Sequence, residues 1–167
     1  MPSPLVFMRE AVREARQTMN RGLGKPFGAV VVRDDVIVGR GANVIFQSQD
    51  PTDHAEIRAL REAAKALGRM SLEDCYLYAT GQPCLMCLGT AFLMRIPKLY
   101  YANSYKDAEA LGYKGGAAAL SLIRTLGGEQ NHFDGDFRTS PGMEVVRLQL
   151  PEAEELYQVW QASGHSL

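Results

Sequence analysis

The chain has little cysteine and no long apolar run: its 167 residues include three cysteines and one tryptophan. Three cysteines cannot build a disulfide framework, so we expect a reducing, cytoplasmic environment. The apolar segments are too short to cross a bilayer, and Arg9 and Glu10 already interrupt the first one, so we expect no secretory or membrane-spanning segment. Repeats, low-complexity tracts and interdomain linkers are also missing.

The charges show no surplus of either sign. The formal net charge is −1, and the C-terminal segment is acidic, with Glu152, Glu154 and Glu155. Proteins that bind an RNA loop need a basic surface, because phosphate contacts supply much of the affinity. The balance therefore favours a small-molecule partner over a nucleic acid. The length and the ordinary share of apolar residues, 46%, predict a single globular domain over residues 1–167.

Two short segments carry metal-binding residue types. They are His54-Ala55-Glu56 and, about thirty residues later, Pro83-Cys84-Leu85-Met86-Cys87. A catalytic zinc site uses about three His or Cys ligands and keeps one position open for water. Alone, a Cys-x-x-Cys segment could be a redox pair or half of a structural zinc site, and a His-x-Glu segment is usually plain helix surface. Together and in this order they indicate a catalytic zinc site.

The local pattern places both segments at the starts of helices. Apolar residues recur at helical period over residues 54–67, and Glu56 falls inside that apolar stripe. An acid that faces the interior usually has a partner or a task. His54 lies about 160° from Glu56 on an ideal helix, so both can reach one site only if His54 is in an irregular first turn. Pro83 is predicted at the first position of the next helix, with Cys84 and Cys87 on one face near the positive end of its dipole.

The remaining pattern predicts strands and helices in alternation. Cys75 precedes a short strand and is expected to be a small core residue. We expect helices over 4–22, 54–67, 84–95, 105–111, 117–126 and 152–163, a hairpin of 27–32 and 36–43, strands over 75–79, 99–102 and 144–150, and a turn-rich segment over 129–141.

The order of these motifs resembles the cytidine deaminase-like superfamily, in the branch of guanine deaminases, tRNA adenosine deaminases and fungal cytosine deaminases. The resemblance rests on Pro26-Phe27-Gly28-Ala29, Asn43, Asp50-Pro51-Thr52 and the two metal-binding segments. It implies a three-layer α/β/α sandwich with a mixed sheet of about five strands. It also implies one Zn²⁺ per chain, bound by His54, Cys84 and Cys87, with Glu56 as the general acid and base.

The resemblance further implies residues that contact the substrate. Asn43 corresponds to a base-binding asparagine, and its amide would offer both a donor and an acceptor to a lactam edge. The backbone N–H of Ala55 would lie beside the attacking water or the leaving amino group of the substrate. Phe27 would either stack on the substrate ring or fill the core. Leu93 stands where bacterial guanine deaminases carry an aromatic residue.

The substrate stays open at this stage, with guanine first. The stretch from Asp107 to Tyr113 resembles guanine deaminases, but Leu93 replaces an aromatic residue of theirs, and their acidic pair is replaced by Lys114, Gly115 and Gly116. Gln82 stands where a glutamate commonly precedes the Pro-Cys pair. The junction at 93–98 is closer to fungal cytosine deaminases. The alternatives are cytosine, isocytosine, an aminotriazine, tRNA adenosine, and a non-catalytic zinc-binding protein of the same fold.

Two further points concern assembly and a structural-metal alternative. The resemblance implies a homodimer, which the apolar surface around Phe92 and Met94 allows. The apolar residues of the C-terminal helix could dock on a neighbouring subunit or equally pack within their own chain. A purely structural zinc site would need a fourth ligand, for which His132 and His165 are poorly placed.

Overall fold

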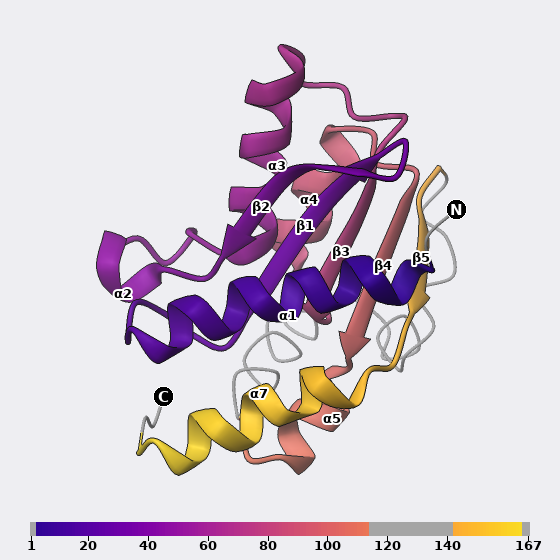
Figure 1. Ribbon diagram of the computed structural model, residues 1–167. Helices are drawn as coiled ribbons and strands as arrows, with labels where there is room; N and C mark the ends of the chain where they lie inside the picture. Colours follow the sequence, from indigo (N-terminus) through magenta and orange to yellow (C-terminus); the bar gives the residue numbers. More distant parts are fainter. Residues whose placement is uncertain (1–2, 114–141, 165–167) are drawn as a thin grey trace, which may run out of the picture.

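The computed structural model describes residues 3–113 and 142–164 of the chain. Five strands form one mixed sheet in the order β2-β1-β3-β4-β5 (Figure 1). The first two, β1 (Gly28–Arg33) and β2 (Val36–Ala42), form an antiparallel hairpin, and β1 also runs antiparallel to β3 (Tyr76–Gly81). The parallel half consists of β3, β4 (Lys98–Asn103) and β5 (Glu144–Arg147).

Helices cover both faces of the sheet. Side chains of α3 (Ala55–Leu67) and α4 (Leu85–Leu93) build one apolar core with β1, β3 and β4. On the other face, α1 (Pro4–Asn20) and α7 (Pro151–Ala162) build a second core. The predicted three-layer α/β/α sandwich with a mixed five-stranded sheet is therefore confirmed. Two short helices, α2 (Ile45–Ser48) and α5 (Tyr105–Ala110), follow β2 and β4, and α2 was not predicted.

The helix that follows the hairpin lies unusually close to β2. A Cβ atom on Gly39 would overlap the carbonyl oxygen of Ala59, and one on Gly41 would overlap that of Ala55. Only glycine permits such a close approach of strand and helix backbones. These two residues therefore set the height of α3 above the sheet and place its first turn beside the end of β2. Gly68, with φ of 64°, ends the helix in the left-handed conformation.

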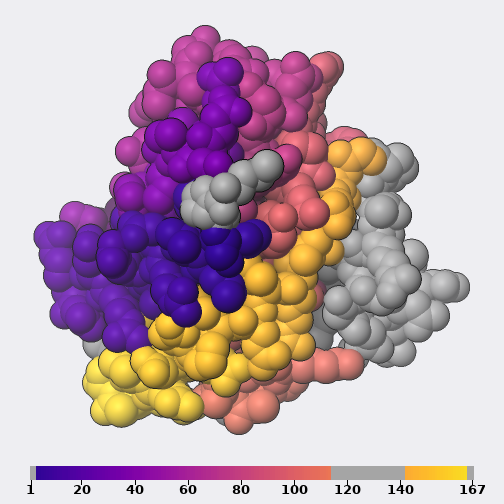
Figure 2. Space-filling view, turned by 45° about the vertical axis from the view of Figure 1, so that its right-hand side comes forward, coloured from indigo at the N-terminus to yellow at the C-terminus, as the bar shows by residue number. Residues whose placement is uncertain are grey.

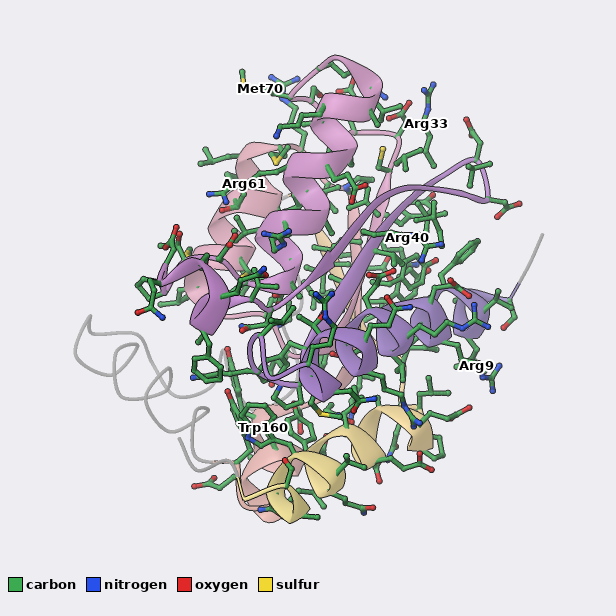
Figure 3. All side chains as sticks on the ribbon, turned by 60° about the vertical axis from the view of Figure 1, so that its left-hand side comes forward. Arg9, Arg33, Arg40, Arg61, Met70 and Trp160 are labelled. Carbon is green, nitrogen blue, oxygen red and sulfur yellow. The ribbon has the colours of Figure 1, made fainter. Side chains whose placement is uncertain are left out.

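The N- and C-terminal helices lie side by side, as Figures 1 and 2 show. Arg9 pairs with Glu152 at 2.9 Å, and Arg16 pairs with Glu155 at 2.6 Å. The apolar side of α7, including Trp160, is buried within its own chain. The structure thus adopts the intramolecular packing of this helix. Figure 3 shows Arg40 reaching from β2 toward α1, where it pairs with Glu10 and Glu14 and ties the hairpin to this layer.

Most predicted elements are confirmed, with shifts at their ends. Pro83 was expected at the first helical position of α4, but the helix begins at Leu85, and Pro83 precedes its N-cap residue. The predicted strand over 144–150 stops at Arg147. Cys75 is fully buried, as expected. The expected helix over 117–126, the segment 129–141, Lys114, His132 and His165 lie outside the described residues.

No helix among residues 3–113 and 142–164 is long and apolar enough to span a membrane.

Candidate metal centre and substrate cavity

The metal-binding segments meet at the starts of α3 and α4. His54 is the N-cap residue of α3 and Cys84 is the N-cap residue of α4, and Cys87 lies in the first turn of α4. Both N-cap residues have extended backbones, with ψ of 155° and 171°. Neither side chain makes the usual N-capping hydrogen bond, so the donor atoms of both are available to a metal ion. The irregular first turn required for His54 is therefore present.

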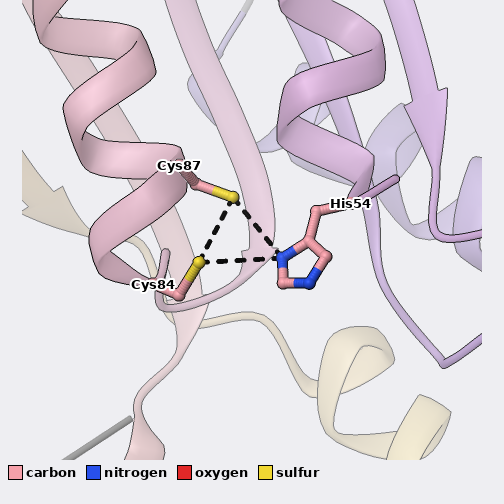
Figure 4. Close-up of side chains that lie close together, drawn as sticks. All are labelled: His54, Cys84 and Cys87. Carbon is pink, nitrogen blue, oxygen red and sulfur yellow. Dashed lines mark hydrogen bonds between the residues drawn. The ribbon is translucent and has the colours of Figure 1, made fainter. Parts of the chain in front are cut away.

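The three donor atoms have the spacing of zinc ligands (Figure 4). The two sulfurs are 3.6 Å apart, and His54 Nδ1 lies 3.7 Å from Cys84 Sγ and 3.5 Å from Cys87 Sγ. A tetrahedral zinc ion with ordinary bond lengths separates two sulfurs by about 3.8 Å and a sulfur from a nitrogen by about 3.6 Å. The donor set and its spacing fit one Zn²⁺, and the three ligands leave the fourth position open.

The environment of the two thiols differs. The hydrogen bond with Cys87 lowers the pKa of Cys84 to about 4, and His54 contributes to the same shift. The same contact, together with burial, raises the pKa of Cys87. The contact therefore favours one thiolate in the pair. Binding a cation favours the second, because zinc takes cysteine in its thiolate form.

Glu56 lies at the second position of α3 and is only 8% exposed. It lines the same cavity as His54 and Cys84. Burial raises the pKa of its carboxyl group, partly offset by the nearby His54. A buried carboxyl group with a raised pKa holds a proton more readily than one in water. The arrangement therefore puts a group that can accept and return protons beside the metal-binding atoms.

A cavity of about 140 Å³ opens beside the metal-binding atoms. An engineered cavity of roughly 150 Å³ accommodates a benzene ring, so this space suits a small heterocycle. Its wall includes a cluster of three aromatic rings: Phe27 and Tyr113 are edge to face at 5.3 Å, and Phe27 and Tyr157 at 5.9 Å. Among the described residues, the lining comprises Lys25, Phe27, Asn43, His54, Glu56, Gln82, Cys84, Asn103, Ser104, Tyr105, Ala108, Tyr113 and Tyr157.

Asn43 follows β2 and is 1% exposed. Its Oδ1 accepts hydrogen bonds from the backbone N–H groups of Lys25, at 2.9 Å, and Ile45, at 3.4 Å. These donors fix the orientation of the amide and occupy both lone pairs of the oxygen. The amide N–H groups are therefore the part of Asn43 that is left for a ligand, and its contact with a substrate stays a prediction.

The segment that carries Cys84 is held from β4 and α5. Tyr105 donates its hydroxyl hydrogen to the carbonyl of Pro83 at 2.9 Å, and its backbone N–H donates to Oε1 of Gln82 at 3.0 Å. The capping box of α5 and its ion pair from Arg147 to Asp107, 2.6 Å, fix this helix in turn. Tyr105 therefore connects α5 to the metal-binding segment.

The structure brings together six of the eight residues predicted for the site. His54, Cys84 and Cys87 form the metal-binding cluster, and Glu56, Asn43 and Phe27 line the cavity. Ala55 is fully buried at the first position of α3 and is not among the lining residues. Leu93 is 81% exposed at the far end of α4, beside a separate surface hollow.

Sequence reasoning missed part of the lining. Lys25 directly precedes the Pro26-Phe27 motif, so its position next to the site was available as a signal. Tyr113 closes the stretch that resembles guanine deaminases. Tyr157 comes from α7, far along the chain, and only the packing of that helix brings it to the cavity.

A His/Cys/Cys cluster with a buried glutamate, at two helix starts on a mixed five-stranded sheet, defines a zinc-dependent aminohydrolase of the deaminase type. The family model for the cytidine and deoxycytidylate deaminase zinc-binding region matches residues 1–103, so the chain belongs to this family. The cytidine deaminase-like assignment, the enzyme class and the zinc cofactor are thereby confirmed.

Individual relatives act on different substrates. The guanine deaminase of Bacillus subtilis is 44% identical over 107 residues, which cover 64% of this chain and 69% of that protein. Its crystal structure superposes with a TM-score of 0.68 and 33% identity, covering 96% of this chain and 95% of the other. The tRNA-specific adenosine deaminase of Aquifex aeolicus is 38% identical over 96 residues, which cover 58% of this chain and 63% of that protein.

Proposed function

We propose that the protein hydrolytically deaminates a free nucleobase and releases ammonia, with guanine as the first substrate to test. The observation that carries the proposal is the small, aromatic-walled cavity beside the metal-binding atoms, whose volume suits a single heterocycle. The similarity to the guanine deaminase of Bacillus subtilis supports the choice of guanine.

The proposed chemistry assigns each group one task. His54, Cys84 and Cys87 would hold the zinc ion, which, when bound, makes hydroxide available from water near neutral pH. The Glu56 carboxylate takes one proton from the attacking water and delivers it to a ring nitrogen. It then takes the second proton, from the hydroxyl group now bonded to the ring carbon, and delivers it to the leaving amino group. The oxygen of water forms a bond to the ring carbon, the carbon–nitrogen bond breaks, and ammonia leaves.

Other residues would position the ring. Phe27 belongs to the aromatic cluster of the cavity wall and offers a face or an edge to a flat ligand. The amide N–H groups of Asn43 would donate to a carbonyl oxygen or ring nitrogen of the base. The N–H of Ala55, at the first position of α3, has no partner within the helix and would serve the water or the amine. Leu93 stays a proposed contact that depends on a second subunit, because it lies away from this cavity.

Deamination of adenosine in tRNA is the second candidate, supported by the similarity to the Aquifex aeolicus enzyme. The net charge of −1 opposes it, because tRNA binding requires a basic surface.

A panel of ammonia-release assays decides between the candidates. It contains guanine, isocytosine, cytosine, adenine, aminotriazines, their nucleosides and tRNA. We expect guanine to be turned over fastest, and turnover of a pyrimidine with inert guanine would overturn the choice.

We also propose that one deaminase domain of 1–167 forms a homodimer through the end of α4. Phe92 and Leu93 are large apolar side chains that are 49% and 81% exposed, and they adjoin a surface hollow with Ile96. Adjacent exposed apolar groups are typical of protein interfaces. Sedimentation should give the mass of two chains, and Leu93→Glu should give that of one. A monomeric wild-type protein would contradict this proposal. The cytoplasmic location stays a prediction from the cysteine count.

A further inference from the structure

Lys25 places a positive charge at the wall of the cavity. Its side chain is half-buried, and its Nζ lies 6.0 Å from the centre of the Tyr113 ring. None of the ion pairs formed within the described part of the chain includes Lys25. Burial lowers the pKa of its ammonium group, which reflects lost hydration. An ammonium group that has lost water and has no anionic partner gains free energy from a ligand that supplies an acceptor.

The backbone of Lys25 is held against Asn43. The Lys25 N–H donates to Asn43 Oδ1 at 2.9 Å, and the Asn43 N–H donates to the carbonyl of Phe27 at 3.0 Å. The preceding residue, Gly24, lies so close that a Cβ atom there would overlap the Asn43 carbonyl oxygen. Lys25 therefore extends from a fixed backbone position beside the Asn43 amide.

Together the two side chains present only hydrogen-bond donors. The Asn43 oxygen is already occupied by two backbone N–H groups, which leaves its N–H groups, and the ammonium of Lys25 has no acceptor atom. The O6 and N7 atoms of guanine are adjacent acceptors, and lysine commonly binds them in DNA recognition. Adenine instead presents a donor at N6 beside the acceptor N7, and an asparagine reads that pair with both its oxygen and its nitrogen. Asn43 has no oxygen to offer.

We propose that Lys25 is a specificity-determining residue that binds, with the Asn43 amide, the O6/N7 edge of an oxopurine. The inference rests on the proposed function in taking the ligand to be a free purine base. It predicts selection for guanine against 2,6-diaminopurine, which keeps the amino group at C2 but carries a second amino group in place of O6. A donor facing that second amino group leaves both unpaired, which costs binding free energy.

The first test compares the two purines as substrates. Wild-type protein should favour guanine over 2,6-diaminopurine at least about tenfold in kcat/KM. Lys25→Met should lower kcat/KM for guanine about 10- to 100-fold and change that for 2,6-diaminopurine less than about threefold, so that discrimination collapses. Lys25→Arg keeps the charge and the donors and should keep the preference. Lys65→Met, on the exposed side of α3, is the matched control and should change neither substrate.

Two results in this assay would overturn the proposal. One is an equal loss for both purines with Lys25→Met, and the other is no loss for either. Zinc content and thermal midpoint, measured for each variant, separate a folding defect from a binding defect. If Lys25→Met does not fold, Lys25→Gln removes the charge while keeping a polar side chain. The same loss of discrimination, measured as the ratio of kcat/KM for guanine to that for 2,6-diaminopurine, is expected for it.

The second test measures binding without turnover. In a Glu56→Gln background, calorimetric titration with 8-azaguanine, which retains O6 and N7, should give affinity that falls at least about tenfold on adding Lys25→Met, while affinity for 2,6-diaminopurine stays level. Lys25-dependent binding in a protein that releases no ammonia from guanine would reject the proposed substrate and support the role of Lys25. If guanine is turned over but Lys25→Met changes neither binding nor discrimination, the proposed substrate is supported and the role of Lys25 is rejected. Absence of binding by either purine would overturn the role of Lys25.

Discussion

His54 and Cys84 hold the same position in two different helices. Each is the N-cap residue, and each has an extended backbone. Their donor atoms, His54 Nδ1 and Cys84 Sγ, lie 3.7 Å apart. Two helix starts therefore face one point, and the positive ends of both helix dipoles stabilise thiolate there.

The zinc content depends on this pair. Purified protein should contain about one zinc ion per chain, and His54→Ala or Cys84→Ser should bind far less, because two ligands hold zinc much more weakly than three. Metal analysis after dialysis against a chelator measures this. Cys75→Ser is the matched cysteine control and should keep its zinc. Full zinc content in the Cys84→Ser protein would refute the ligand assignment.

Glu56→Gln should separate chemistry from metal binding. The amide has the same shape as the carboxylate but cannot transfer the proton, so turnover should fall by a factor of about 10² to 10⁴. Zinc content and thermal midpoint should stay close to those of the wild type. Measuring ammonia release at saturating substrate tests this, and unchanged turnover would show that another group moves the proton.

Asn43→Asp should weaken substrate binding and leave the local fold intact. A carboxylate still accepts the N–H groups of Lys25 and Ile45, but it removes the donors that face the ligand. We expect kcat/KM to fall about 10- to 100-fold. Asn43→Ala, which also leaves the two backbone donors unpaired, should in addition lower the thermal midpoint. Equal activity of wild type and Asn43→Asp would exclude Asn43 as a donor to the substrate.

Gly41→Ala tests the close contact of β2 and α3. The added Cβ would overlap the Ala55 carbonyl and displace the first turn of the helix, so the free energy of unfolding should fall by about 1–3 kcal/mol. Because that turn carries His54, zinc affinity should fall as well. Gly89→Ala, inside α4, is the control: apart from its own helix, no atom of the described residues lies within 4 Å of its added Cβ, and alanine favours a helix. Urea unfolding measures the free energy of unfolding of both variants. Equal values for Gly41→Ala and Gly89→Ala would contradict the close contact of β2 and α3.

Cys75 should contribute to the loss of stability at high pH. Burial raises the pKa of its thiol from 9.0 to about 11. Because the folded pKa is the higher one, the contribution is fully present below pH 9 and is lost as the pH rises from 9 toward 11. The difference in unfolding free energy between wild type and Cys75→Ala should therefore change across that interval and be level below it. A constant difference would contradict the shift.

Local signals in the sequence determined the elements and the metal chemistry. Hydrophobic period separated strands from helices, and the residue types His54, Cys84 and Cys87, with Glu56 inside an apolar stripe, were sufficient to indicate the zinc site. Short-range pattern suffices there because the ligands of each segment lie within one helical turn. The helix boundary at Pro83 was wrong by two residues, since a proline fits the residue before an N-cap as well as the first turn.

Only the tertiary structure decided which distant groups share the cavity. Tyr157 reaches it because α7 packs on α1 within the same chain, a choice that an amphipathic pattern leaves open. The Asn43 amide lost its acceptor because backbone N–H groups from two neighbouring turns occupy it, and Lys25 became a cavity residue through the same contact. Residue types and spacing determine which chemistry is present, whereas hydrogen bonds across the fold determine which side of each polar group a ligand meets.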